Sequence, residues 1–200
     1  METTNLTPFN LTRWILLTVA GWFTGVVIII GLGLITESTG LNLGGNSVVG
    51  IGMGAGVGWM QWLALKKHIA VSKNWIWFSI AAFTITYVVA DILGGFYELK
   101  PETFLPFATA LGALLSGLLQ YQFILNKLSS RALQWIILSV IGWSLAHFFT
   151  MGLYQLKLDF LPRVVQITLA FSFLLLAAPV LGFITGKSMN VVLKSKSIAE

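Results

Sequence analysis

The sequence has 200 residues, of which 56% are hydrophobic and only 10% are charged, and it contains no cysteine. Soluble proteins carry about 25% charged residues, so this composition excludes a soluble domain, and the missing cysteines exclude disulfides and thiolate metal sites. The net charge of +5 fits the Lys/Arg bias of cytoplasmic loops better than nucleic-acid binding. We therefore predict an all-α integral membrane protein in contact with the lipid bilayer, without a cofactor or a metal site.

Six apolar runs approach or exceed the roughly 20 residues that a membrane-spanning helix needs. They predict transmembrane helices over residues 13–35, 47–66, 75–97, 104–126, 134–156 and 163–187, and the last helix has room to extend further. Residues 1–12 then form a cytoplasmic N-terminal segment, 13–190 a single transmembrane domain, and 191–200 a basic cytoplasmic tail. The first run follows no small-residue cleavage site, so we interpret it as a retained signal anchor.

The second run is marked by alternating glycines, which form two rows on a helix. One row is Gly50, Gly54 and Gly58, and the other is Gly52 and Gly56. Small residues let a neighbouring backbone approach closely, which is what holds helices together in lipid. We expect this helix to be central, with partners on two sides.

Two prolines fall within predicted helices. Pro106 lies in a first turn, where proline is tolerated, whereas Pro179 lies inside the sixth helix and predicts a kink.

The basic residues are concentrated on one side of the predicted bilayer. That side holds Arg13, Lys66, Lys67, Lys73, Lys127, Arg131, Lys187, Lys194 and Lys196, whereas the other holds Lys100, Lys157 and Arg163 together with Glu37, Glu98, Glu102 and Asp159. The positive-inside rule then predicts that both termini are cytoplasmic. Four tryptophans fall near that boundary and predict an interfacial aromatic belt: Trp14, Trp75, Trp77 and Trp135.

A pattern of a small residue, then glycine four later and glutamine three after that, recurs along the even helices. The three copies are Gly54, Gly58 and Gln61, then Ala113, Gly117 and Gln120, and a weaker third of Gly182, Gly186 and Met189. The odd helices repeat as well, since Trp14 to Trp22 matches Trp135 to Trp143 and Trp75 to Phe83 is a degenerate copy. The period of about 60 residues predicts three tandem helical hairpins related by a parallel repeat.

Asp91 is the one acid well inside a predicted span, and an intramembrane carboxylate is by default a functional hypothesis. The matching positions of the other copies, Ile30 and Met151, are apolar. A structural role is the alternative, in which the carboxylate reaches the outer interface or bonds Tyr87 or a neighbouring helix.

His147 lies in the middle of the fifth predicted helix and matches Tyr87 in the repeat register. Because histidine titrates near neutral pH, a contact between His147 and Asp91 would resemble a minimal proton relay. A neutral histidine bonded inside the bundle is the alternative.

Gln61 and Gln120 are a repeated polar pair that either bridges helices or lines a polar vestibule. The segment 182–188, GFITGKS, is not a phosphate loop, because three residues separate its glycines where that motif needs four.

The repeated pattern resembles that of a group of small bacterial multi-pass membrane proteins, common in cyanobacteria, with tandem GxxxGxxQW and GW hairpins. The resemblance is carried by Gly54, Gly58, Gln61, Trp62, Leu65 and Trp75 and by the Gly142–Trp143 pair, and it fades in the sixth helix. It implies an architecture and a bacterial inner or thylakoid-type membrane, and it implies no activity and no catalytic residue.

Three functions follow from these features. The first is a non-enzymatic membrane module that packs against itself or a larger membrane complex through its small-residue rows. The second is a small transporter or channel that uses Asp91 and His147. The third is an enzyme acting on lipid, which would require Asp91, His147, Tyr87 and Gln134 to gather around one cavity.

Overall fold

A computed structural model describes residues 9–41, 43–98, 100–155 and 161–196, with the backbone alone for 101, 102, 152–155 and 196. The expected segment before Phe9, the residues Lys157 and Asp159, and the end of the expected tail after Lys196 lie outside this description. The helices are α1 (Leu11–Thr39), α2 (Gly45–Leu65), α3 (Asn74–Tyr97), α4 (Pro101–Phe123), α5 (Leu133–Gln155) and α6 (Arg163–Lys196), with the short 3-10 helices η1 (Leu125–Lys127) and η2 (Ser130–Ala132) between α4 and α5. Helices α1 to α6 all contain segments that are long and apolar enough to cross a membrane, which confirms the predicted all-α class with six candidate spans.

The helix ends differ from the predicted bounds for local reasons. Asn10 caps α1, because its side chain accepts a hydrogen bond from the backbone N–H of Arg13. Gly40 ends α1 with φ at 70°, a left-handed conformation that glycine adopts without strain. Helix α6 runs through Pro179 to Lys196, and Val192 is fully buried, so residues 191–196 extend the helix and do not form a separate tail. The kink that Pro179 predicts stays a prediction.

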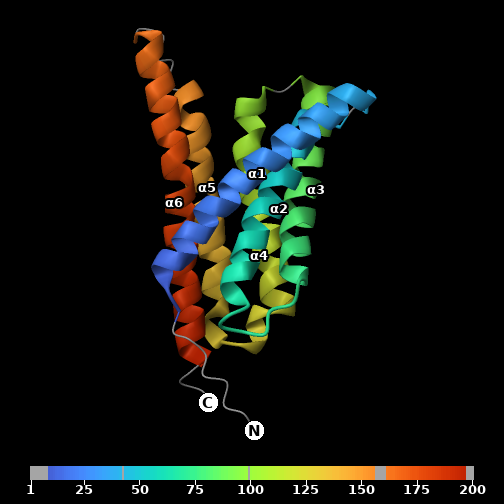
Figure 1. The fold of residues 1–200 in the computed structure, drawn as a ribbon. Coiled ribbons are helices and arrows are strands. Elements are labelled where there is room, and N and C mark those ends of the chain that lie inside the picture. The colour runs from blue at the N-terminus through green and yellow to red at the C-terminus, as the bar shows by residue number, and fades with distance from the viewer. Residues whose placement is uncertain (1–8, 42, 99, 156–160, 197–200) are drawn as a thin grey trace.

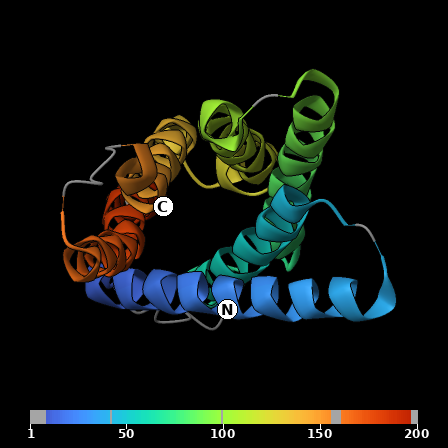
Figure 2. The ribbon, with the colours of Figure 1, turned by 90° about the horizontal axis from the view of Figure 1, so that it is seen from above.

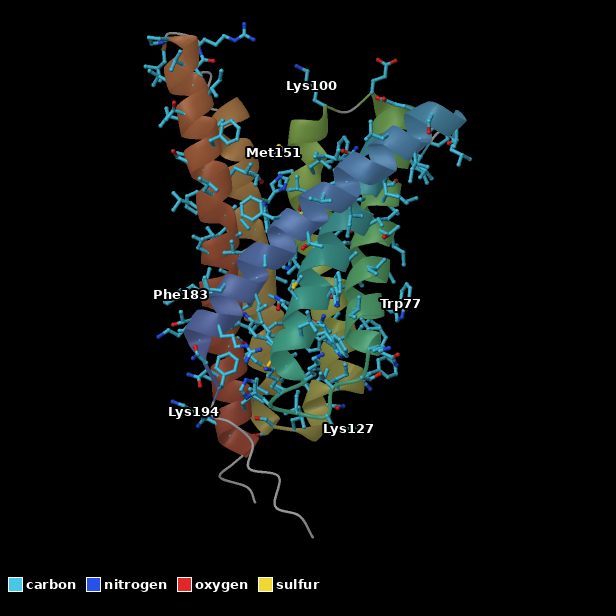
Figure 3. The ribbon with its side chains drawn as sticks, viewed as in Figure 1. Trp77, Lys100, Lys127, Met151, Phe183 and Lys194 are labelled. Atoms are coloured by element: carbon cyan, nitrogen blue, oxygen red, sulfur yellow. The ribbon has the colours of Figure 1, made fainter. Side chains whose placement is uncertain are left out.

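The six long helices form a closed ring (Figure 2). Each packs against the next one in the chain, and α6 returns to pack against α1. The helices alternate in direction, so α1 begins and α6 ends at the same end of the bundle, which we call the terminus end (Figure 1). Lys127 and Lys194 lie at this end and Lys100 lies at the opposite end (Figure 3).

Helix α2 packs closely on both sides through its two glycine rows. A Cβ atom at Gly54 would lie 2.8 Å from the backbone oxygen of Ser79 on α3, and Gly50 and Gly58 face the same helix. A Cβ atom at Gly52 would lie 2.7 Å from the backbone oxygen of Gly25 on α1, which Gly56 also faces. The two rows therefore hold α2 between α1 and α3 at backbone distance.

The small residues of α4 and α6 lie at corresponding contacts. A Cβ atom at Gly117 would lie 3.2 Å from the Cα of Ile136 on α5, and Ala113 is buried. A Cβ atom at Gly182 would lie 3.0 Å from the Cα of Ile15, and one at Gly186 would meet the side chain of Leu11. Each even helix thus presents small residues to an odd helix, and those of α6 close the ring against α1.

Three of the four tryptophans expected in the aromatic belt are buried inside the bundle. Trp14, Trp75 and Trp135 are at most 2% exposed. Trp135 contacts both of the others, with ring centroids 6.1 Å from Trp14 and 5.3 Å from Trp75. They pack inside the bundle because the ring closes around them, whereas Trp77 is 65% exposed and points away from the bundle (Figure 3).

Candidate functional site: a cavity inside the helix ring

A cavity of about 370 Å³ lies inside the ring and is lined by residues from all six long helices. This volume falls within the range of about 300–1,000 Å³ that is typical of small-molecule sites. Val49 lies in the second turn of α2 and Thr150 in the last two turns of α5, so the cavity lies toward the end opposite the termini. The lining residues are Trp22, Val26, Val49, Met53, Tyr87, Thr109, Trp143, His147, Thr150, Met151, Ala170, Phe171 and Leu174.

One wall of the cavity carries a chain of hydrogen bonds from three helices. The hydroxyl oxygen of Tyr87 lies 2.7 Å from Oγ1 of Thr109, which lies 3.1 Å from Nδ1 of His147. The Thr109 hydroxyl also donates to the backbone oxygen of Leu105 at 2.9 Å. Thr109 therefore joins two residues that the sequence singled out separately.

The number of hydrogens on each group decides which atom donates in each of these hydrogen bonds. The Thr109 hydroxyl has one hydrogen, which goes to Leu105, so its oxygen accepts from Tyr87 and from an N–H at Nδ1 of His147. This is the assignment that satisfies all three contacts. In the neutral imidazole, Nε2 of His147 is then a hydrogen-bond acceptor.

Two residues that line the cavity each carry a buried polar atom with no hydrogen-bond partner among the described residues. The atoms are Nε2 of His147 and Nε1 of Trp22, a residue that is only 5% exposed. The indole Nε1 is a donor only. Leaving such groups unmatched is costly in an apolar setting.

Asp91 takes no part in the chain of hydrogen bonds from Tyr87 to His147. Its carboxylate accepts from the backbone N–H of Asn46 at 3.2 Å, from the Asn46 side chain at 2.8 Å and from the backbone N–H of Ser47 at 2.8 Å. The Ser47 hydroxyl also donates to it. Asp91 is thus a cap that α3 supplies to the N-terminus of α2, which has no side-chain cap of its own. The repeat register allowed a contact between Asp91 and His147, and the structure gives the two residues different partners.

The cavity is closed toward the terminus end by aromatic rings. Trp143 stacks on Trp22 with ring centroids 6.0 Å apart, and its centroid lies 4.4 Å from that of Phe83. Trp14, Trp75 and Trp135 form a second buried layer.

The two glutamines lie between these aromatic layers. Gln120 donates to Oγ of Ser79 at 3.0 Å and accepts from Nε1 of Trp135 at 2.8 Å. Gln61 is buried beside it, at a void of about 10 Å³ that Trp143 separates from the large cavity. The geometry of Gln120 is that of a residue that joins three helices.

The sequence did not single out Thr109, Trp22 or Trp143 as residues of a site. Thr109 lies four residues before Ala113, on the same face of α4, so its place on the small-residue row was the available signal. Trp22 and Trp143 were visible as matching positions of the repeat. What the sequence lacked was the rotation of each helix, which decides which residues face the centre of the ring.

The fold and its hydropathy define the class: this is a multi-pass α-helical membrane protein with six candidate spans. Among the residues that the structure describes, no group of three or more His, Cys, Asp or Glu side chains could hold a metal ion. Comparison with known proteins finds no matching protein family, no matching curated protein and no matching solved structure.

Proposed function

We propose that the protein is a non-enzymatic membrane module that binds a small molecule in the cavity of its helix ring. The observation that carries this proposal is the cavity itself, because all six long helices contribute residues to its wall. The exposed apolar surface on the outside of the protein contacts lipid. It is also available to a second copy or to a larger membrane complex.

The composition of the cavity wall favours binding over catalysis. The four residues expected of a lipid-acting enzyme do not gather there, since Asp91 caps α2 and Gln134 is exposed, while only Tyr87 and His147 line the cavity. Intramembrane chemistry generally needs a nucleophile or an acid and base pair facing one another. Among the described lining residues, His147 is the one histidine, and none is Asp, Glu, Lys or Arg.

Contacts between matching positions support the three-hairpin architecture that belongs to this proposal. Trp14, Trp75 and Trp135 form one buried layer. Trp22, Phe83 and Trp143, each eight residues further along, form the next. We place both termini on the cytoplasmic face of a bacterial inner or thylakoid-type membrane, and reporter fusions at the two ends would contradict this by reporting opposite faces.

The experiment is to incubate the purified protein in nanodiscs with a total polar lipid extract and follow both binding and turnover. We expect at least one extracted molecule to raise the melting temperature, and mass spectrometry to find no lipid consumed. Turnover that disappears in His147→Phe would overturn the proposal in favour of an enzyme.

A transporter is the second candidate, because the cavity is closed toward the terminus end while Phe171 and Met151 on its wall are exposed. A transporter that works by alternating access has states in which its binding cavity is open to one side of the membrane only. In proteoliposomes, His147→Phe should then abolish a flux that the unmodified protein shows. Absence of flux under any ion or proton gradient would count against this candidate.

A further inference from the structure

We propose that the cavity takes up a hydrocarbon chain of a bilayer lipid, which enters sideways between α1 and α6. This inference rests on the proposed binding function and adds the class of ligand and its route. Three observations carry it: the packing of α1 on α6 is confined to one half of each helix, the cavity is exposed along the other half, and its lining is uncharged.

The contacts that close the ring between α1 and α6 lie near the terminus end. Nε1 of Trp14 donates to Oγ1 of Thr185 at 3.0 Å, and a Cβ atom at Gly182 would lie 3.0 Å from the Cα of Ile15. Both contacts join the first turns of α1 to the second half of α6. From there the two helices diverge toward the opposite end of the bundle (Figures 1 and 2).

Burial along the two helices changes at the same level. The buried residues of α1 end at Gly25, and none of residues 26–39 is buried. On α6 none of residues 163–176 is buried, and the buried residues begin at Ala177. We call the line between these two unburied stretches the open seam.

The cavity reaches the open seam. Val26 on α1 and Ala170, Phe171 and Leu174 on α6 line the cavity, so its wall includes both sides of the seam. Ala170 is exposed, and Phe171 is 62% exposed.

The other flank of α6 is packed at this level. The rings of Phe149 on α5 and Phe173 on α6 have centroids 5.7 Å apart. The seam between α1 and α6 is therefore the side on which a chain can pass.

The opening lies at the depth of lipid chains. Phe171 is eight residues from the start of α6 at Arg163, which is about 12 Å along the helix axis, and the hydrocarbon core of a bilayer is about 30 Å thick. The exposed side chains beside the seam are apolar, with Val27 68% exposed on α1 and Ile167 50% and Leu175 55% exposed on α6. An opening with such a rim faces acyl chains, and lipid headgroups lie beyond it.

The lining suits a chain without polar groups. No Asp, Glu, Lys or Arg is among the described lining residues. The hydroxyls of Tyr87, Thr109 and Thr150 are already engaged in hydrogen bonds within the protein. The unpartnered nitrogens of Trp22 and His147 are covered by other atoms and offer almost no surface to an occupant.

The volume sets the size of the chain segment. An apolar cavity of about 150 Å³ holds benzene, so 370 Å³ has room for roughly ten carbons of a chain. A lipid chain is already in an apolar phase, so the hydrophobic effect does not draw it from the bilayer. It gains dispersion contacts with a wall that no protein side chain fills.

The experiment is photoaffinity labelling of the purified protein in phosphatidylcholine nanodiscs. One probe is a phosphatidylcholine with a diazirine near the end of an acyl chain, and the comparison probe carries the diazirine in the headgroup. Met53 reports on the cavity, because it lies on its wall and is only 8% exposed, and Ile30, which is 58% exposed, reports on the outer surface. We expect the chain probe to label both residues and the headgroup probe to leave Met53 unlabelled.

Two variants test the route. Ala170→Trp places a large ring at the mouth, and crowding of this kind should lower the labelling of Met53 about ten-fold relative to Ile30. The matched control is Ser172→Trp, which adds the same ring at an exposed residue that does not line the cavity and should leave the labelling ratio unchanged. If Ala170→Trp does not fold, the two probes on the unmodified protein still test the occupant.

A cysteine reporter tests for entry from water. The chain has no cysteine, so Met53→Cys gives a single thiol on the cavity wall and Thr39→Cys gives one at an exposed helix end. We expect a charged, membrane-impermeant maleimide to modify Met53→Cys much more slowly than Thr39→Cys. Equal rates would show a water-filled cavity and would overturn the hydrocarbon occupant.

The outcomes separate this inference from the proposed function. If the chain probe fails to label Met53 while another extracted molecule raises the melting temperature, the lipid chain is wrong and binding in the cavity stands. If Ala170→Trp leaves the labelling of Met53 unchanged, entry through the open seam is wrong. If no probe labels Met53 and no extracted molecule raises the melting temperature, the proposed function fails as well.

Discussion

The contact of α2 with α3 is a place where one added methyl group has an effect that can be worked out. A Cβ atom at Gly54 would lie 2.8 Å from the backbone oxygen of Ser79 and 2.9 Å from the Cα of Ile80. Both are backbone atoms, which no rotamer change can move aside. Because ordinary van der Waals contact begins at 3.4 Å, Gly54→Ala must separate the two helices locally by about 0.6 Å, the difference between 3.4 Å and 2.8 Å.

The loss in free energy of unfolding that we expect for Gly54→Ala is best measured against a matched control variant. Overpacking of this kind costs about 1–3 kcal/mol, whereas alanine in place of a helical glycine contributes about 1 kcal/mol of stability. A Cβ atom at Gly31 on α1 would meet no neighbouring atom within 4 Å, so Gly31→Ala has the helical gain without the clash. Since the helical term cancels, Gly54→Ala should be less stable than Gly31→Ala by about 1–3 kcal/mol.

Equilibrium unfolding in mixed micelles of a mild detergent and SDS measures this difference. The buried tryptophans report the loss of packing by fluorescence, and circular dichroism follows the helices. Equal free energies of unfolding for the two variants would refute the reasoning, because they would mean that α2 and α3 are not in backbone contact at Gly54.

Two further substitutions test polar contacts. Asp91→Asn should lower the free energy of unfolding by about 1–3 kcal/mol and speed hydrogen exchange at the amides of Asn46 and Ser47, because the carboxylate cap of α2 is lost; unchanged protection of those amides would contradict the capping role. Trp135→Phe should cost about 1–3 kcal/mol, because the bond to Gln120 Oε1 is lost inside the bundle, whereas Trp77→Phe should stay within about 0.5 kcal/mol of the unmodified protein. Thermal unfolding compares the two variants, and equal shifts would be the contrary result.

The sequence by itself determined the class of the protein and the approximate extent of its helices. Apolar runs of sufficient length and the distribution of charges are local properties of the chain, and a bilayer imposes a helix on each such run because backbone groups must be satisfied internally. The glycine rows of α2 were readable for the same reason, since helical periodicity alone places Gly50, Gly54 and Gly58 on one face.

The tertiary structure decided what the polar residues do. Asp91 had the strongest functional signal in the sequence, yet its partners are the first residues of α2, which only packing brings near. The only signal for Thr109 was its place on the small-residue row of α4, yet it joins Tyr87 to His147. The physical reason is that a residue's neighbours depend on how each helix is rotated and on the closure of α6 against α1, and no local pattern along the chain encodes either.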